Sequence, residues 1–178
     1  MYLRSYGLLP YHRLAELFED PFSIPLSPAT LVNINRACGQ RLAWVSEAIR
    51  TALVREPVIS CDETGMSING RLIWLHVANT ESLTYYAAHR KRGQEALSEI
   101  DILPDFQGTA IHDHFRSYFR YGSDHVLCNA HHLRERTFIH EESRQDWARE
   151  LHDLLLEMNA AVETAVREGR VQTVPEHP

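Results

Sequence analysis

The feature that most constrains the fold is a change of hydrophobic period at residue 58. Apolar residues before it recur every three or four positions, whereas apolar and polar residues alternate over much of residues 58–77. Spacings of three and four are typical of helices, and alternation is typical of strands. Asn69 and Gly70 interrupt the alternation, and this pair is a strong signal for a tight β-hairpin turn. The sequence therefore predicts two antiparallel strands, at residues 58–68 and 72–77.

The elements that follow suggest how these strands are extended into a sheet. Further strands are predicted at 83–88, 108–113 and 125–130, with a short amphipathic helix before the fourth strand and a brief helix before the fifth. This succession resembles that of the ribonuclease H-like fold. We therefore expect an α/β (α+β) fold with a mixed sheet of five strands flanked by helices, in which the first and fourth strands lie side by side.

Helices are expected both before and after these strands in the sequence. A helix at 11–19 is followed by a long one with Ser27 as N-cap and Pro28 at its first position, and Pro57 closes it. Another helical stretch runs from residue 132 almost to Gly169. The first two helices resemble a helix-turn-helix, but their long connection favours a simple packing element.

This pattern predicts three segments. Residues 1–57 form an N-terminal helical segment, residues 58–140 a partial ribonuclease H-like core, and residues 141–178 the start of a helical insertion that we expect to be truncated.

Composition and charge narrow the class of protein. The chain has 44% hydrophobic residues, typical of a globular protein, and no segment approaches the roughly 20 apolar residues of a membrane span. We expect a cytoplasmic protein without a membrane partner. Three cysteines form no close pair, which argues against a disulfide framework. The net charge is −6, but residues 141–178 carry nine acidic and four basic residues, so a basic surface elsewhere is compatible with the sequence.

Two carboxylates stand out in the predicted sheet. Asp62 interrupts the first strand beside Glu63, and Asp113 ends the fourth. Adjacent strand residues point to opposite faces, so we expect Asp62 to point inward, held by a metal ion, and Glu63 to face the other way. If strands one and four are neighbours, Asp62 and Asp113 meet at one end of the sheet.

Paired carboxylates suit a hard divalent cation. Mg²⁺ or Mn²⁺ would offset their repulsion, and two such ions can promote phosphodiester chemistry. Two alternatives stay open. Asp62 could cap a turn or pair with an arginine, and Asp113 could be satisfied by its neighbours His112 and His114.

A third group of residues lies at 128–136, where a strand runs into a helix. Cys128, His131 and His132 include zinc-type ligands, but a closed structural site needs four. We therefore expect Cys128 to pack in the core and His131 to lie near the metal end of the sheet.

Basic residues form two small groups that could contact DNA phosphates. The candidates are Arg134 and Arg136, on the opening turns of that helix, and Lys91 and Arg92 after the third strand. The alternative for both groups is a solvated, salt-bridging surface.

Four stretches together resemble one protein family. They are LLPYHRLAELF, ISCDETGMSINGRLIWLHVA, HRKRGQEALSEIDILPDFQGTAIHDHFRSYF and CNAHHLRE, and they are similar to the insertion sequence 66 family of bacterial transposases over nearly the whole chain. The resemblance implies an acid-triad enzyme that cuts and joins DNA with two Mg²⁺ ions, or Mn²⁺. Asp62 and Asp113 would be catalytic residues and metal ligands, and the partners would be transposon ends, target DNA and further copies of the chain.

The resemblance also implies an incomplete site. The family's closing glutamate lies in an ERAIRP-like motif that this sequence lacks, and Glu135 is not its equivalent by motif. We expect the third acid, and the upstream regions used for DNA binding, to lie outside this chain. The alternative function is a non-catalytic remnant that acts as a DNA-binding or assembly module. A zinc-dependent hydrolase is disfavoured by the ligand count.

Overall fold

A five-stranded mixed sheet forms the centre of the protein. The computed structural model describes residues 2–170. The strands are β1 (Val58–Ile68), β2 (Arg71–Asn79), β3 (Thr84–His89), β4 (Thr109–His112) and β5 (Asp124–Leu127). Their order in the sheet is β3-β2-β1-β4-β5.

The pairing directions confirm the predicted ribonuclease H-like arrangement. The first three strands form an antiparallel meander, while β1 pairs with β4, and β4 with β5, in parallel. Asn69 and Gly70 join β1 to β2 with φ angles of 51° and 73°. Positive φ at both positions is what a type I′ hairpin turn requires, and Asn-Gly adopts it readily. The local turn signal therefore sets the register that starts the sheet.

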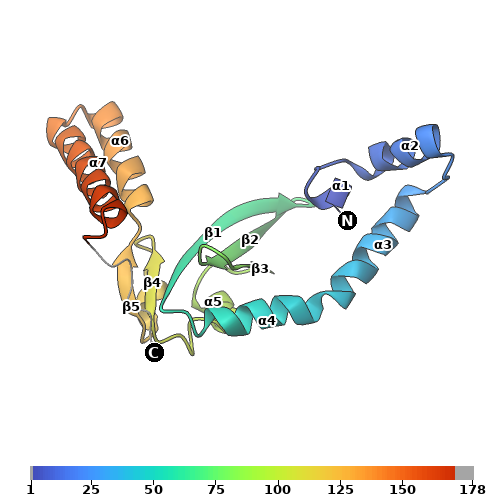
Figure 1. The fold of residues 1–178 in the computed structure, drawn as a ribbon, viewed down its shortest axis with the longest axis horizontal. Helices are drawn as coiled ribbons and strands as arrows, with labels where there is room; N and C mark the ends of the chain where they lie inside the picture. The colour runs from blue at the N-terminus through green and yellow to red at the C-terminus, as the bar shows by residue number, and fades with distance from the viewer. Residues whose placement is uncertain (1, 171–178) are drawn as a thin grey trace.

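Seven α-helices and one 3₁₀ helix are found in residues 2–170. The α-helices are α1 (Tyr2–Ser5), α2 (Tyr11–Phe22), α3 (Pro28–Arg41), α4 (Ala43–Leu53), α5 (Gln94–Ile100), α6 (Asn129–Ser143) and α7 (Asp146–Arg167), and the 3₁₀ helix η1 spans Tyr118–Arg120. In Figure 1, α3 and α2 extend away from the sheet, and α6 and α7 form a separate hairpin beside β4 and β5.

Two predicted helices are each divided in the structure. The helix expected to run unbroken to Pro57 changes direction at Leu42, where ψ is 2°, and continues as α4. The helix expected from residue 132 ends at Arg144, whose left-handed φ of 52° stops α6 before α7 begins. α7 has Glu168 as its C-cap, and Gly169 follows with a left-handed φ of 69°, so the helical stretch ends beside Gly169 as the sequence predicted. The three-segment division of the chain stays a prediction, and its residues 171–178 lie outside the described part.

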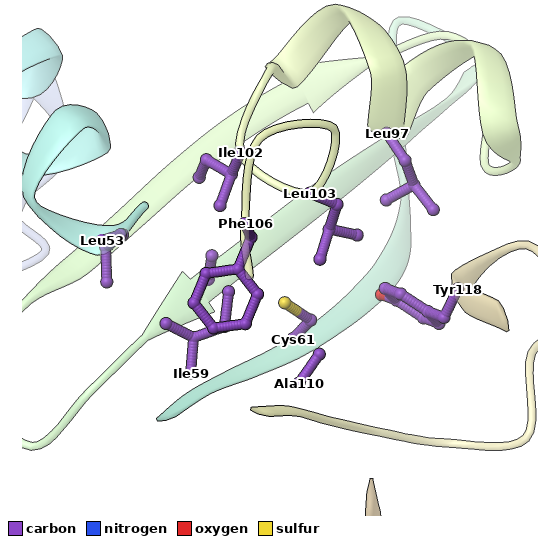
Figure 2. Close-up of a cluster of buried hydrophobic side chains, with 10 residues drawn as sticks. Leu53, Ile59, Cys61, Leu97, Ile102, Leu103, Phe106, Ala110 and Tyr118 are labelled. Carbon is purple, nitrogen blue, oxygen red and sulfur yellow. The ribbon is translucent and has the colours of Figure 1, made fainter. Parts of the chain in front are cut away.

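The hydrophobic core lies on one face of the sheet. Figure 2 shows side chains from α4, β1, α5, the loop after α5, β4 and η1 meeting there; the buried residues are Leu53, Ile59, Cys61, Ala78, Leu97, Ile102, Leu103, Phe106, Ala110 and Tyr118. On β1 the buried positions are Ile59 and Cys61, which alternate with less buried residues. No helix within residues 2–170 has the length and apolar character needed to cross a bilayer.

Candidate active site where the pairing of β1 and β4 ends

The parallel pairing of β1 and β4 brings the two predicted aspartates to the place where this pairing ends, which is the middle of the longer strand β1. The last aligned pair is Ser60 with Ile111, and Asp62 and Asp113 each lie two residues further along. The rise per residue is nearly the same in neighbouring parallel strands, so Asp62 and Asp113 lie at the same height along the two strands. This juxtaposition is what the sequence order predicted from strands far apart in the chain.

Asp62 lies on the less covered face of the sheet. Its side chain is 49% exposed, and Oδ1 accepts a hydrogen bond of 2.9 Å from the backbone N–H of Glu63. His131, from the first turn of α6, places Nε2 3.9 Å from the same oxygen. His131 therefore lies where the sequence placed it, at the carboxylate end of the sheet.

Glu63, not Asp62, is the inward carboxylate, so the expected orientation of this pair is wrong. The Glu63 side chain is only 1% exposed. It shares a face with Ile59 and Cys61, because residues two apart in a strand point the same way. The alternation of apolar side chains thus fixes the orientation: Glu63 continues the core face, and Asp62 falls on the other.

Two side chains compensate the buried charge of Glu63. Arg92 donates from Nε to Oε1 at 2.7 Å, and the Tyr118 hydroxyl donates to Oε2. Burial and the neighbouring Glu63 carboxylate both raise the pKa of Tyr118, so it stays a neutral donor. The guanidinium also lies over the rings of Phe115 and Trp74, at 4.1 and 5.1 Å from the ring centroids. A salt bridge between distant segments therefore replaces the metal that we had expected to hold the inward acid.

The same arginine reaches towards Asp113. Arg92 Nη2 lies 3.6 Å from Asp113 Oδ2, while Asp113 Oδ1 accepts a hydrogen bond of 2.8 Å from the backbone N–H of Phe115. Asp113 is thereby oriented on both sides, with 21% of its side chain exposed. Arg92, predicted as a DNA contact, is directed in this structure at two carboxylates of its own chain.

Histidines surround this end of the sheet. His112 is fully buried at the end of β4, and its Nδ1–H donates to the backbone carbonyl of Asp113 rather than to the carboxylate. Its Nε2 lies 2.9 Å from Nδ1 of His125. Burial lowers the pKa of His112, which favours the neutral ring. The alternative in which His112 neutralises the Asp113 carboxylate therefore does not describe this structure.

His114 belongs to a different group. Its Nδ1 lies 3.2 Å from Glu135 Oε1, and His132 is also close to this carboxylate. Sequence reasoning missed the group, since it treated His132 with Cys128 and His131, and considered Glu135 only to reject it as the family's third acid. The ligand atoms of His114, His132 and Glu135 lie within 4.8 Å of one another.

The remaining predicted DNA contacts lie at the surface or against other residues. Lys91 is exposed, with its ammonium 3.9 Å from Glu95. Arg134 is exposed on α6, and Arg136 lies with its guanidinium 5.7 Å from the centroid of the Trp147 ring. Of the four predicted cations, Lys91 and Arg134 are the most accessible to an external phosphate.

The donor atoms of the two aspartates suit a hard cation. Asp62 and Asp113 offer carboxylate oxygens, which are the ligands that Mg²⁺ and Mn²⁺ prefer. Asp62 Oδ2 has no hydrogen bond from any residue in the described part of the chain, and half of the side chain is open to solvent. The two aspartates could therefore hold a divalent cation together with water.

Comparison with known proteins gives one clear relationship. The family model described as Transposase IS66 family matches residues 1–177. No curated protein gave a significant match. Among solved structures, the chain is similar to part of a simian T-cell lymphotropic virus intasome solved by cryo-EM in complex with PP2A regulatory subunit B56 gamma. That match has 13% identity and a TM-score of 0.32, and it covers 53% of this chain and 46% of that chain.

Proposed function

Since the chain belongs to the IS66 family of transposases, we propose that it forms the catalytic region for metal-dependent cleavage and transfer of insertion-sequence DNA. The observation that supports this proposal is the register of the parallel strands β1 and β4, in which Asp62 and Asp113 each lie two residues beyond the last aligned pair. The Asp62 side chain is half exposed, and that of Asp113 is 21% exposed although it also contacts Arg92 and the Phe115 N–H. Two acidic side chains brought together in this way form a candidate binding site.

In this proposal Asp62 and Asp113 hold Mg²⁺ or Mn²⁺. A cation bound there would supply Lewis-acid activation of a phosphodiester and of a water molecule. The family resemblance implies two such ions.

The chain's own contribution is to orient the carboxylates. Arg92 and the backbone N–H of Phe115 hold Asp113 from two sides. Glu63 in turn fixes Arg92 from within the core, through the 2.7 Å salt bridge. His131 lies beside Asp62, where its ring could exchange a proton with water near that carboxylate.

Lys91 and Arg134 are our candidates for contacts to the DNA backbone. Both are exposed, and a cation that meets a phosphate adds affinity without selecting sequence. Neutralising either residue should weaken DNA binding similarly for all sequences and reduce its dependence on salt. Arg92 and Arg136 are weaker candidates, because their guanidinium groups contact Glu63 and the Trp147 ring.

The cleavage proposal is tested by Mn²⁺-dependent nicking of supercoiled DNA. Because this sequence lacks the family's ERAIRP-like motif with the closing glutamate, we expect the wild type to nick only weakly, and both Asp62→Asn and Asp113→Asn to abolish that residual activity. Asp105→Asn is the matched control, because Asp105 is an exposed acid outside the site. Equal nicking by the wild type and Asp62→Asn would indicate a contaminating nuclease and contradict the role proposed for Asp62. No nicking by the wild type would favour the alternative of a non-catalytic DNA-binding or assembly module.

A second candidate function, assembly, is favoured by the surface of α7. Leu154, Met158 and Val162 repeat every four residues and are 49%, 57% and 57% exposed. An apolar stripe with this spacing forms one face of a helix and suits packing against another helix. Self-association measured by light scattering, and reduced by Met158→Glu, would support an assembly role alongside or instead of catalysis.

A further inference from the structure

Two histidines and a glutamate converge beside the aspartate pair. His132 and Glu135 lie one turn apart on α6, and His114 comes from the loop that follows β4. Glu135 Oε1 lies 3.2 Å from His114 Nδ1, and Glu135 Oε2 lies 3.8 Å from His132 Nδ1. With metal–ligand bonds of about 2.0–2.1 Å, ligand atoms of a tetrahedral zinc site lie about 3.3 Å apart. The cluster is therefore close to the size of such a site.

One ring nitrogen in this cluster lacks a partner. Nδ1 of His132 is buried and has no hydrogen bond within the described residues. A buried polar atom without a partner costs roughly 1–3 kcal/mol, so such an atom needs an explanation. A bound metal ion would be one such explanation, because a neutral imidazole nitrogen is a good metal ligand.

A second cluster on the chain shows the contrast. His89 lies near Glu95 and Glu99, and these ligand atoms also fall within 4.8 Å of one another. However, both nitrogens of His89 are occupied: Nδ1 accepts from the backbone N–H of Lys91 at 2.9 Å, and Nε2 lies 3.2 Å from Glu99. Both carboxylates there are exposed. The His89 group is satisfied without a metal, whereas His132 is not.

We propose that His114, His132 and Glu135 form a binding site for a borderline divalent metal, with Zn²⁺ as the preferred ion. Two imidazoles and one carboxylate suit Zn²⁺ and disfavour Mg²⁺, which prefers oxygen ligands. Three protein ligands leave a fourth position for water or a substrate group. This site is separate from the aspartate pair, and it does not depend on the proposed nuclease function.

The position of the site suggests what the metal would do. It would join the loop after β4 to the first turns of α6. His114 directly follows Asp113, and His132 directly follows His131, which lies beside Asp62. A metal bridge here would fix the two segments that carry residues of the aspartate site. We therefore expect Zn²⁺ to rigidify the strand–helix junction and to raise the stability of the chain.

The proposal is tested on the 178-residue chain by titration with Co²⁺, whose visible absorption reports coordination geometry, followed by displacement with Zn²⁺. We expect one equivalent of Co²⁺ to give intense absorption typical of four-coordinate sites, and stoichiometric Zn²⁺ to abolish it. His132→Gln and His114→Gln should each lower the affinity by about 100-fold or more, since each removes a direct ligand. His89→Gln, from the satisfied cluster, is the matched control and should bind as the wild type does.

Further measurements separate loss of ligands from loss of fold. Circular dichroism identifies a variant that fails to fold, and in that case Glu135→Gln, which keeps the side-chain size, takes its place. Asp62→Asn should bind Zn²⁺ normally, so failure of the nuclease proposal would leave this one intact. The proposal is overturned if the wild type gives no four-coordinate Co²⁺ spectrum, or if the His132 and Glu135 variants bind as tightly as the wild type.

Discussion

Removing Arg92 tests the claim that a salt bridge, rather than a metal, holds the buried acid. In Arg92→Met the apolar stem is kept, but Glu63, 1% exposed, loses its only cationic partner among the described residues. Removing one member of a buried pair typically costs about 3–5 kcal/mol. Arg92 itself is 38% exposed, so water can partly replace it, and Tyr118 still donates to Glu63. We therefore expect a loss of about 2–3 kcal/mol.

The assay is urea and thermal unfolding followed by circular dichroism. For a chain of this size a loss of that order corresponds to a fall in Tm of about 4–12 °C. Arg90→Met is the matched control, since Arg90 is the exposed cation two positions away, and its cost should stay below about 0.5 kcal/mol. Adding Glu63→Gln to Arg92→Met should restore part of the loss, because it removes the unpaired charge. A loss for Arg92→Met no larger than for Arg90→Met, or a double variant that is simply additive, would refute the reasoning.

Three further predictions concern packing, pH and thiol chemistry. Gly108→Ala should destabilise the chain by about 2 kcal/mol or more, because a Cβ at this position would lie 2.5 Å from the carbonyl oxygen of Pro57. The control Gly122→Ala places its Cβ in open space and should leave stability nearly unchanged. Equal urea midpoints for the two variants would contradict this prediction. Burial lowers the pKa values of His76 and His112 below the ordinary 6.5, so the unfolded chain binds more protons than the folded chain. The free energy of unfolding should therefore be highest above pH 6.5 and should fall as the pH drops below that value. A urea midpoint that rises on acidification would contradict this. Burial raises the pKa of the Cys61 thiol to about 12. At pH 8 this thiol should therefore react with a disulfide reagent only as fast as the chain unfolds. Fast labelling of Cys61 in the native chain would contradict the packing described above.

Much of the sheet could be predicted because its signals are local. The Asn69-Gly70 turn and the alternation on either side of it specify the first hairpin. The adjacency of Asp62 and Asp113 followed from the order of elements, since the fold pairs β1 with β4. The break at Arg144 had no such signal: a left-handed residue that is not glycine or asparagine is uncommon, and the apolar periodicity runs on past it.

The orientation of the acidic pair was missed although a signal was present. Ile59 and Cys61 are apolar and two residues apart, which already assigns the odd-numbered face of β1 to the core. Glu63 continues that face, but the metal-ligand role assigned to Asp62 led us to place Asp62 inside and Glu63 outside. What permits its burial is Arg92, 29 positions away in the chain. Only the folded arrangement shows that these two residues meet.

The histidine cluster was hidden for a similar reason. Cys128, His131 and His132 are adjacent in sequence and were considered together, whereas the residues that converge are His114, His132 and Glu135. The first comes from a loop and the others from successive turns of α6. Spacing within one segment can predict the pair on the helix, but not the third ligand from another element.

The most direct test of the central claim is whether Asp62 and Asp113 share one cation. Mn²⁺ binding would be measured by electron paramagnetic resonance in a Glu135→Gln background, so that the histidine cluster does not contribute. We expect Asp62→Asn and Asp113→Asn each to weaken binding by about tenfold or more, and the double variant to be little weaker than either, because both remove the same site. Unchanged affinity in either single variant, or independent effects that add in the double variant, would contradict the account.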